Sequence, residues 1–315
     1  MKIPISEISK SLIFGIISDE TWNLIIWDFR LPKAIVAIFA GMGLSVAGLQ
    51  MQTIFRNPLA GPYVLGISSG ASLGVAFLFL GFTSIFPLSM MDYLGNWAVV
   101  FSAWIGAAMV LFLILSVSFR IKDIMTILIL GIMFGSISSS IISILEYFSH
   151  EIMLKKYVIW MMGSLVNVSK SQLEILILSV VIGLLISIFL TKKLNILLMG
   201  ENYAKTIGVN VKRTQYLVFL SVSILAGTIT AFCGPIGFIG IAVPHVARMF
   251  FNTSDHKHLI LGSAIIGAIV MLLSDIISQM PGSNSVLPIN AVTSLIGIPI
   301  IIWIVVKNHK MSSSI

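Results

Sequence analysis

Residues 34–55 read AIVAIFAGMGLSVAGLQMQTIF, a stretch that contains no charged side chain. A helix needs about 20 mainly apolar residues to cross the hydrocarbon core of a bilayer, and this stretch is long enough. The segment that follows, RNPLAGP at 56–62, contains two prolines, so the chain must turn sharply there. Together the two segments predict a transmembrane helix that ends in a polar turn.

Long apolar runs separated by short polar segments continue along the chain. They lie at 34–55, 63–82, 97–118, 124–148, 173–190, 215–233, 236–251, 258–280 and 290–306. The run at 236–251 is short and contains Pro244, which is typical of a broken or partial helix. The piece 160–163 is too short to span and indicates a half-helix. We therefore expect an all-α polytopic membrane protein with about nine spans.

The composition excludes a soluble globular protein. Hydrophobic residues make up 57% of the chain and charged residues 10%, whereas soluble domains carry about 25% charged residues. Most of the surface must therefore face lipid. Cys233 is the single cysteine, so no intrachain disulfide can form. The net charge of +7 sits between apolar runs, which favours a role in membrane topology over nucleic-acid binding.

The positive charges predict an orientation. Alternate loops divide the 19 lysine and arginine residues into twelve on one side and seven on the other. The positive-inside rule then places the C-terminus in the cytoplasm and the N-terminus outside. Accordingly, we expect an extracytoplasmic N-terminal segment at 1–29, a transmembrane permease domain at 30–306 and a cytoplasmic tail at 307–315.

Small residues recur at every fourth position on several runs. One stripe consists of Gly131, Gly135, Ser139 and Ser143, which share one helix face. In lipid, such a face lets two backbones approach closely, so helix packing is one interpretation. The hydroxyl groups in mid-membrane favour another, a wall of a transport pathway. Further stripes are Gly66, Gly70 and Gly74, and Ser223, Gly227 and Ala231.

Few residues could carry chemistry. No stretch has the Gly-x4-Gly-Lys-Ser/Thr pattern that binds nucleotide phosphates, so we predict no ATPase and no other enzyme activity. The histidines at 245, 256 and 258 lack the spacing of metal ligands, and we predict no metal site. Asp275 lies inside a span, near its outer end. At the centre of a span, a carboxylate costs about 2.5–3.5 kcal/mol on insertion, so Asp275 must face protein or water rather than lipid. We favour a structural hydrogen-bonding role for Asp275 over a proton relay.

Two polar insertions fall on the predicted cytoplasmic side, at 50–62 and 199–209. The second begins like a short helix, with Glu201 near its N-terminus and Gly208 as a plausible end. A short cytoplasmic helix between two spans is a natural contact for a partner protein.

Several motifs occur in one order over residues 30–306. They are Arg30-Leu31-Pro32-Lys33, Asn57-Pro58-Leu59-Ala60, the segments 65–71 and 160–163, Gly200-Glu201 with Ala204 and Gly208, and the segments 237–240, 243–248, 255–257 and 297–299. In this combination the chain resembles the FecCD-type permeases of ABC importers for ferric siderophores, haem and cobalamin.

The resemblance implies a fold and a set of partners. Such permeases have the type II ABC importer fold with ten helices per subunit, work as homodimers in the inner membrane, and translocate their cargo along the dimer axis. Two ABC ATPase subunits bind the cytoplasmic face, and a periplasmic or lipid-anchored substrate-binding protein docks outside. ATP and Mg belong to the ATPase, so the resemblance implies no cofactor bound by this chain.

The resemblance also implies roles for individual residues. Those that match the ATPase-coupling loop are Gly200, Glu201, Ala204 and Gly208. Asn57 and Leu59 match a cytoplasmic gate. The residues that match the lining of the pathway are Gly131, Gly135, Ser139 and Ser143. Arg30 and Lys33 match residues that dock the binding protein, although lysine lacks the bidentate fork of the arginine usual at the second position.

The chain departs from the family pattern in three places. Only about 30 residues precede the Arg-Leu-Pro motif, without a span, so we expect nine spans where the family has ten. Gln279 stands where the family often has a docking arginine, and 286–290 lacks a glutamate and a glycine of the family motif.

These features predict a permease subunit that imports a ferric siderophore by alternating access, driven by a separate ATPase. Haem and cobalamin remain alternative cargoes. An ion-coupled secondary transporter is a second hypothesis, but it needs paired ionisable groups in mid-membrane. A non-transporting scaffold is a third.

Overall fold

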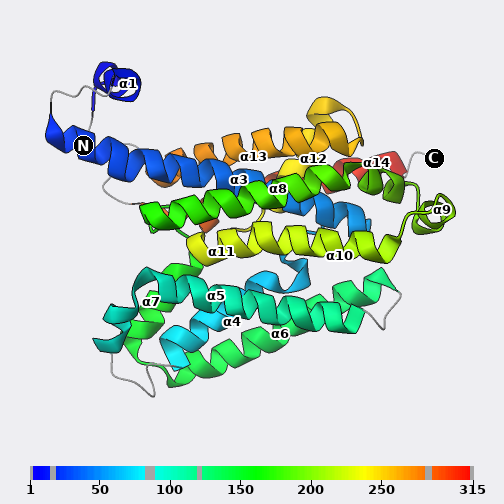
Figure 1. The fold of residues 1–315 in the computed structure, drawn as a ribbon, viewed down its shortest axis with the longest axis horizontal. Helices are drawn as coiled ribbons and strands as arrows, with labels where there is room; N and C mark the ends of the chain where they lie inside the picture. The colour runs from blue at the N-terminus through cyan, green and yellow to red at the C-terminus, as the bar shows by residue number, and fades with distance from the viewer. Residues whose placement is uncertain (1–2, 15–18, 82–88, 119–122, 281–285, 313–315) are drawn as a thin grey trace.

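A computed structural model describes residues 3–14, 19–81, 89–118, 123–280 and 286–312, and these form helices joined by short turns (Figure 1). The α-helices are α1 (Ile5–Phe14), α2 (Glu20–Leu24), α3 (Leu31–Phe55), α4 (Ile67–Ala76), α5 (Ser89–Ser118), α6 (Ile124–Phe148), α7 (Glu151–Met161), α8 (Lys170–Leu198), α9 (Glu201–Thr206), α10 (Val211–Val222), α11 (Thr228–Cys233), α12 (Ile239–Phe251), α13 (His256–Ser278) and α14 (Ile289–Ser312). Shorter turns of other helix types are η1 (Ile25–Arg30), η2 (Pro62–Leu65), η3 (Phe77–Gly81) and η5 (Ser223–Gly227).

Each apolar run predicted from the sequence corresponds to a helical segment. Within the described residues, six segments are long and apolar enough to cross a membrane: Glu20–Phe55, Gly95–Val117, Ile124–Phe148, Lys170–Leu198, Val211–Cys233 and His256–Ser278. The other three runs correspond to shorter apolar helices, Ile67–Gly81, Ile239–Phe251 and Ile289–Trp303. The prediction of an all-α polytopic membrane protein is thus confirmed.

The first and last of these segments extend beyond the predicted runs. The first begins at Glu20 rather than at residue 34, and α14 continues to Ser312. Two of the charged side chains in this extension, those of Asp28 and Lys33, form ion pairs with other helices. Lys170 lies 2.5 Å from Asp28, and Lys33 lies 2.7 Å from Asp275. The domain boundaries at 30 and 306 remain predictions.

Pro244 lies within α12 and does not break it. A proline lacks the N–H that would bond to the carbonyl four residues earlier, here that of Gly240. This carbonyl lies against Gly48 of α3, where an added Cβ would come within 1.7 Å of the oxygen. The proline therefore occurs at the point where two helix backbones approach most closely.

The helices form two groups. The α3 group consists of α3, α8, α12, α13 and α14, with α3 packed against α8, α12 and α13. The α4 group consists of α4, α5, α6 and α7, and α10 and α11 lie between the groups (Figure 1). The stripe at 66, 70 and 74 packs on α5, since a Cβ at Gly70 would lie 2.5 Å from the carbonyl oxygen of Gly106. The packing interpretation is confirmed for that stripe.

The two ends of the bundle differ in what they carry. The end with α1 also holds the start of α3, whereas the opposite end holds α9 and the C-terminal part of α14 (Figure 1). An odd number of spans predicts that the N-terminal and C-terminal parts of the chain lie at opposite ends of the bundle. We refer to these two ends as the α1 end and the α9 end.

Candidate functional site

α9 is a short helix at one end of the bundle, between α8 and α10 (Figure 1). Gly200 precedes it with φ 120°, and Gly208 follows it with φ 89°. Residues with a Cβ rarely adopt these conformations, so glycine sets both ends of the helix. The N–H of Val209 donates to the carbonyl of Ala204 over 2.9 Å and closes the loop. The predicted short helix with Gly208 beyond its end is confirmed.

One side of α9 is anchored and the other is open. Ala204 is fully buried, and Nε2 of Gln215 donates to Glu201 over 3.3 Å. On the open side, Met199, Tyr203 and Ile207 are exposed by 69%, 49% and 53%. Tyr203 and Ile207 therefore expose apolar surface at this end of the molecule, beside the exposed polar side chains of Asn202 and Lys205.

The turn after α3 lies beside the α9 loop. Arg56 adopts the left-handed conformation with φ 47°, and its Nη2 donates to the carbonyl of Leu197 over 3.1 Å. The next turn is closed by Asn57, whose side-chain oxygen accepts from the N–H of Leu59 over 2.9 Å. Leu59 is 46% exposed. The two predicted elements, the coupling loop and the gate, thus meet through Arg56.

A second link holds the same turn to α12. The ring of His245 lies with Nε2 2.8 Å from the carbonyl oxygen of Pro58. Nη1 of Arg248 donates to Gln52 over 2.6 Å, and Gln52 in turn donates to the carbonyl of Ile241 over 3.1 Å. The turn is therefore fixed from α8 on one side and from α12 on the other.

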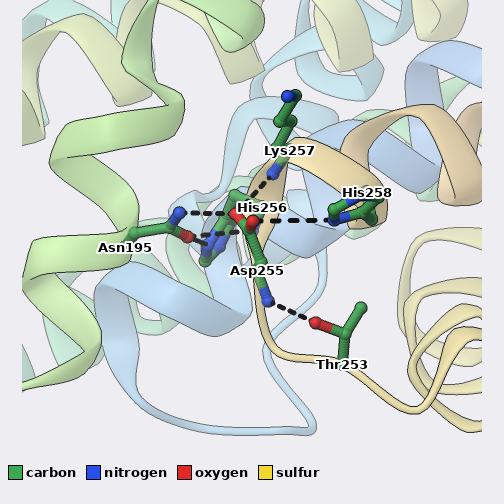
Figure 2. A network of polar contacts seen from close by, with 6 residues as sticks. All are labelled: Asn195, Thr253, Asp255, His256, Lys257 and His258. Atoms are coloured by element: carbon green, nitrogen blue, oxygen red, sulfur yellow. Dashed lines mark hydrogen bonds and ion pairs between the residues drawn. The ribbon is translucent and has the colours of Figure 1, made fainter.

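A polar network that the sequence did not predict lies at the start of α13 (Figure 2). Asn195 of α8 binds both Asp255 and His256. The backbone N–H of Lys257 and the amide of Asn195 hold the pKa of Asp255 below its ordinary value of 3.8. The motif at 255–257 was visible in the sequence, but nothing near it in the chain pointed to Asn195.

The chain matches the family model described as the FecCD transport family over residues 1–307. It belongs to the FecCD transport family. Its relatives include the vitamin B12 import system permease protein BtuC of Citrobacter koseri, 33% identical over 91% of this chain and 84% of that protein. The hemin transport system permease protein HmuU of Yersinia pestis is 32% identical over 94% of this chain and 87% of that protein.

Solved structures agree with this assignment. An inward-facing structure assigned as a metal-chelate type ABC transporter has a TM-score of 0.82 at 29% identity, covering 92% of this chain and 90% of that chain. PsaBC from Streptococcus pneumoniae has a TM-score of 0.58 at 18% identity, covering 89% and 92%, and shares the fold alone. This FecCD-family chain is therefore a multi-pass ABC importer permease, a non-enzymatic subunit that works with ATPase subunits and a substrate-binding protein.

In this FecCD-family permease, the small-residue stripe on α6 divides into two parts. Gly131 faces η2, since a Cβ there would lie 2.4 Å from the carbonyl oxygen of Val64, and Gly135 faces Ser69 of α4. Ser139 and Ser143, further along α6, are exposed on the single chain. The first part thus serves packing within the chain, and the assignment of the stripe to a pathway remains a prediction.

The two predicted docking residues differ in their surroundings. Arg30 is exposed at the α1 end. The ammonium of Lys33 lies 2.7 Å from a carboxylate oxygen of Asp275, and the two side chains are only 15% and 11% exposed. Nε2 of Gln279 donates to the other oxygen of Asp275 over 3.0 Å. Asp275 therefore has the structural role favoured from the sequence, as the partner of Lys33.

Proposed function

We propose that this FecCD-family permease imports a ferric siderophore as a homodimer in the inner membrane, with the α9 end in the cytoplasm. ATP binding and hydrolysis in two separate ABC ATPase subunits drive alternating access. The observation that carries the proposal is the connection between α9 and the turn at 56–59 through Arg56. A partner that moves α9 would also move the predicted gate.

The surface of α9 supports the assignment of the ATPase contact. The exposed side chains of Met199, Tyr203 and Ile207 are apolar or amphipathic, and they lie at an end of the bundle rather than on its lipid-facing sides. Aromatic and methionine side chains are enriched in protein interfaces. The excess of lysine and arginine on this side supports a cytoplasmic location for the α9 end, where ATP is available.

The open face of the α4 group supports the homodimer. Only 17% of the most apolar window of α6 is buried within one chain. Ser139 and Ser143 lie on this helix and are exposed. Polar side chains are unfavourable on a surface that faces lipid, so these two serines favour a protein or water environment for this face of α6. A second copy against α6 would place these serines beside a shared pathway.

The proposed cargo, a ferric siderophore, rests on similarity to other transporters and not on a site in this chain. The structural relative of metal-chelate type favours an iron chelate. The relatives that import vitamin B12 and hemin have nearly equal identity, 33% and 32%, so cobalamin and haem are the two alternatives.

The experiment is ATP-dependent uptake into proteoliposomes that contain the permease, an ABC ATPase that co-purifies with it, and a binding protein. Tyr203→Ser with Ile207→Asp should reduce ATPase co-purification about tenfold or more, because two interface anchors are removed. Tyr147→Ser is the matched control, since Tyr147 is 82% exposed and ends α6 at the α1 end.

Three outcomes would contradict the proposal. Uptake that follows a proton gradient and ignores ATP would indicate a secondary transporter. Co-purification of no ATPase would indicate a scaffold. Uptake of cobalamin or haem in preference to a ferric siderophore would reassign the cargo.

A further inference from the structure

Three helix ends meet at the α9 end around His256. The ring of His256, the first residue of α13, is 1% exposed. Its Nδ1 lies 2.7 Å from the side-chain oxygen of Asn195 on α8, and its Nε2 lies 2.7 Å from the hydroxyl of Thr53 on α3. We call Thr53, Asn195, Asp255 and His256 the His256 network.

Asn195 uses both ends of its amide on the start of α13 (Figure 2). Its nitrogen donates to a carboxylate oxygen of Asp255 over 2.6 Å. Its oxygen accepts from the backbone N–H of His256 over 2.8 Å and faces Nδ1 of the ring. Because the amide nitrogen is fixed by the carboxylate, the orientation of the oxygen toward His256 is also fixed.

This arrangement determines the direction of the next hydrogen bond. The side-chain oxygen of Asn195 is only an acceptor, so Nδ1 of His256 carries a proton. In the neutral ring Nε2 is then the acceptor, so the contact with Thr53 is a hydrogen bond when the single hydroxyl proton of Thr53 points to Nε2 at 2.7 Å rather than to the carbonyl oxygen of Leu49 at 2.9 Å. A continuous series of directed hydrogen bonds therefore leads from α8 through α13 to α3.

The His256 network joins the bases of the two predicted functional elements. Asn195 lies less than two helical turns before Gly200, where the α9 loop begins. Thr53 lies about one turn before Asn57. Arg56 adds a parallel connection, since it donates to the carbonyl of Leu197 over 3.1 Å. Between α9 and α10, the Gln215–Glu201 bond of 3.3 Å is longer than the bonds of the His256 network.

We propose that the His256 network holds the ends of α3, α8 and α13 as one rigid unit, so that a displacement of α9 reaches the turn at 57–59. Thr53, Asn195 and His256 are positioning residues in this account, and they touch neither cargo nor nucleotide. The inference rests on the proposed function, because it assigns the route by which an ATPase bound at α9 acts on the gate.

The test compares Thr53→Val with Thr53→Ser in the reconstituted complex of permease, ATPase and binding protein. Valine keeps the shape of threonine but cannot donate to His256, whereas serine can. We expect Thr53→Val to lower the number of cargo molecules imported per ATP hydrolysed by about tenfold, since a buried hydrogen bond is worth about that factor in an equilibrium. We expect Thr53→Ser to retain most of the wild-type ratio.

The matched control is Ser187→Ala. This variant removes the buried 2.9 Å hydrogen bond from Nε2 of Gln50 on α3 to Ser187 in the middle of α8, together with the 3.1 Å contact of Ser187 with Ser221 on α10. It should lower thermal stability without changing the ratio of transport to hydrolysis. That ratio separates a positioning role from a structural one.

Several outcomes decide the matter. Thr53→Val with a wild-type ratio would overturn the inference, as would an equal loss in Ser187→Ala. If Thr53→Val does not assemble, Asn195→Leu provides the second variant, because Asn195 is only partly buried and leucine can neither donate to Asp255 nor accept from His256. A wild-type ratio in Asn195→Leu would then overturn the inference. Absence of ATP-driven uptake by the wild type would contradict the proposed function instead.

Discussion

α3 and α6 are both apolar helices of 25 residues, yet they occupy opposite environments. In the membrane span that contains α3, 72% of the most apolar window is buried within the chain, compared with 17% for α6. Hydropathy identifies both as membrane spans and does not distinguish them. Both helices carry small residues, so the difference lies in their neighbours: α3 is surrounded by α8, α12 and α13 of the same chain.

The buried helix and the open helix also treat polar groups differently. α3 directs Gln50 and Thr53 to other helices, where they bind Ser187 and His256. On α6, the hydroxyl of Ser140 donates to the carbonyl of Ser136 on the same helix. These two side chains on α3 therefore connect helices, although Thr53 also lies 2.9 Å from the carbonyl oxygen of Leu49 on its own helix, whereas the bond of Ser140 stays within α6.

The largest expected effect is on the tight backbone contact of α3. Gly48→Ala would place a Cβ 1.7 Å from the carbonyl oxygen of Gly240, so α3 and α12 must separate. We expect a loss of about 3 kcal/mol in the free energy of unfolding, measured as a fall in the thermal midpoint of the protein in detergent.

The control for that variant lies on α6. Gly135→Ala would bring a Cβ 3.2 Å from the hydroxyl oxygen of Ser69, a side chain that can rotate away. Its cost should stay below about 1 kcal/mol. Equal losses in Gly48→Ala and Gly135→Ala would mean that α6 is packed as tightly as α3.

The next effect concerns the ion pair between α3 and α13. Asp275→Leu leaves the ammonium of Lys33 with 15% exposure and no carboxylate, which should cost about 3 kcal/mol. Adding Lys33→Met should recover most of this loss, because both charges are then absent. Thermal unfolding of the two single variants and the double variant gives the coupling energy.

An exposed ion pair at the same end serves as the comparison. Lys170 and Asp28 have side-chain exposures of 73% and 41%, so Lys170→Met should cost no more than about 1 kcal/mol. If Lys170→Met proves as costly as Asp275→Leu, burial does not set the strength of the pair.

The smallest effect is expected at two helix caps. Asp255 caps α13 and Asp123 caps α6. The hydroxyl and N–H of Thr126 hold the pKa of Asp123 below 3.8, as the N–H of Lys257 and the amide of Asn195 do for Asp255. Because both values are lowered on folding, each carboxylate contributes stability above pH 3.8 that is lost as the pH falls further.

Replacement by asparagine tests the caps. Asp255→Asn and Asp123→Asn should each flatten the dependence of the thermal midpoint on pH below about 5. The loss at neutral pH should be larger for Asp255→Asn, because Asp255 also binds Asn195 of α8. If the thermal midpoint of either variant fell more steeply with decreasing pH than that of the wild type, the expectation from the lowered pKa of that aspartate would be contradicted.

The sequence was sufficient for features that depend on neighbours in the chain. The apolar runs predicted the spans, and Glu201 and Gly208 predicted the bounds of α9. The start of the first segment at Glu20 was not predictable in this way, because the charges that follow it are paired with Lys170 and Asp275, far along the chain.

The candidate site was predicted only in part for the same reason. The loop with Ala204 and the turn with Asn57 were recognisable from their motifs. The contact of Asn195 with His256 spans 61 positions, and that of Thr53 with His256 spans 203. Such contacts depend on how the helices are arranged in space, and the spacing of residues along the sequence does not reveal that arrangement.

The Lys33–Asp275 pair has a consequence for the speed of encounters at the α1 end. A binding protein that approaches with an acidic surface is steered by the charges that it meets at a distance. The field of Lys33 is largely cancelled by Asp275 at 2.7 Å, which leaves Arg30 as the exposed cation of the Arg-Leu-Pro-Lys motif. We therefore expect replacement of the pair by Lys33→Met together with Asp275→Leu to change the ionic-strength dependence of association at this face very little.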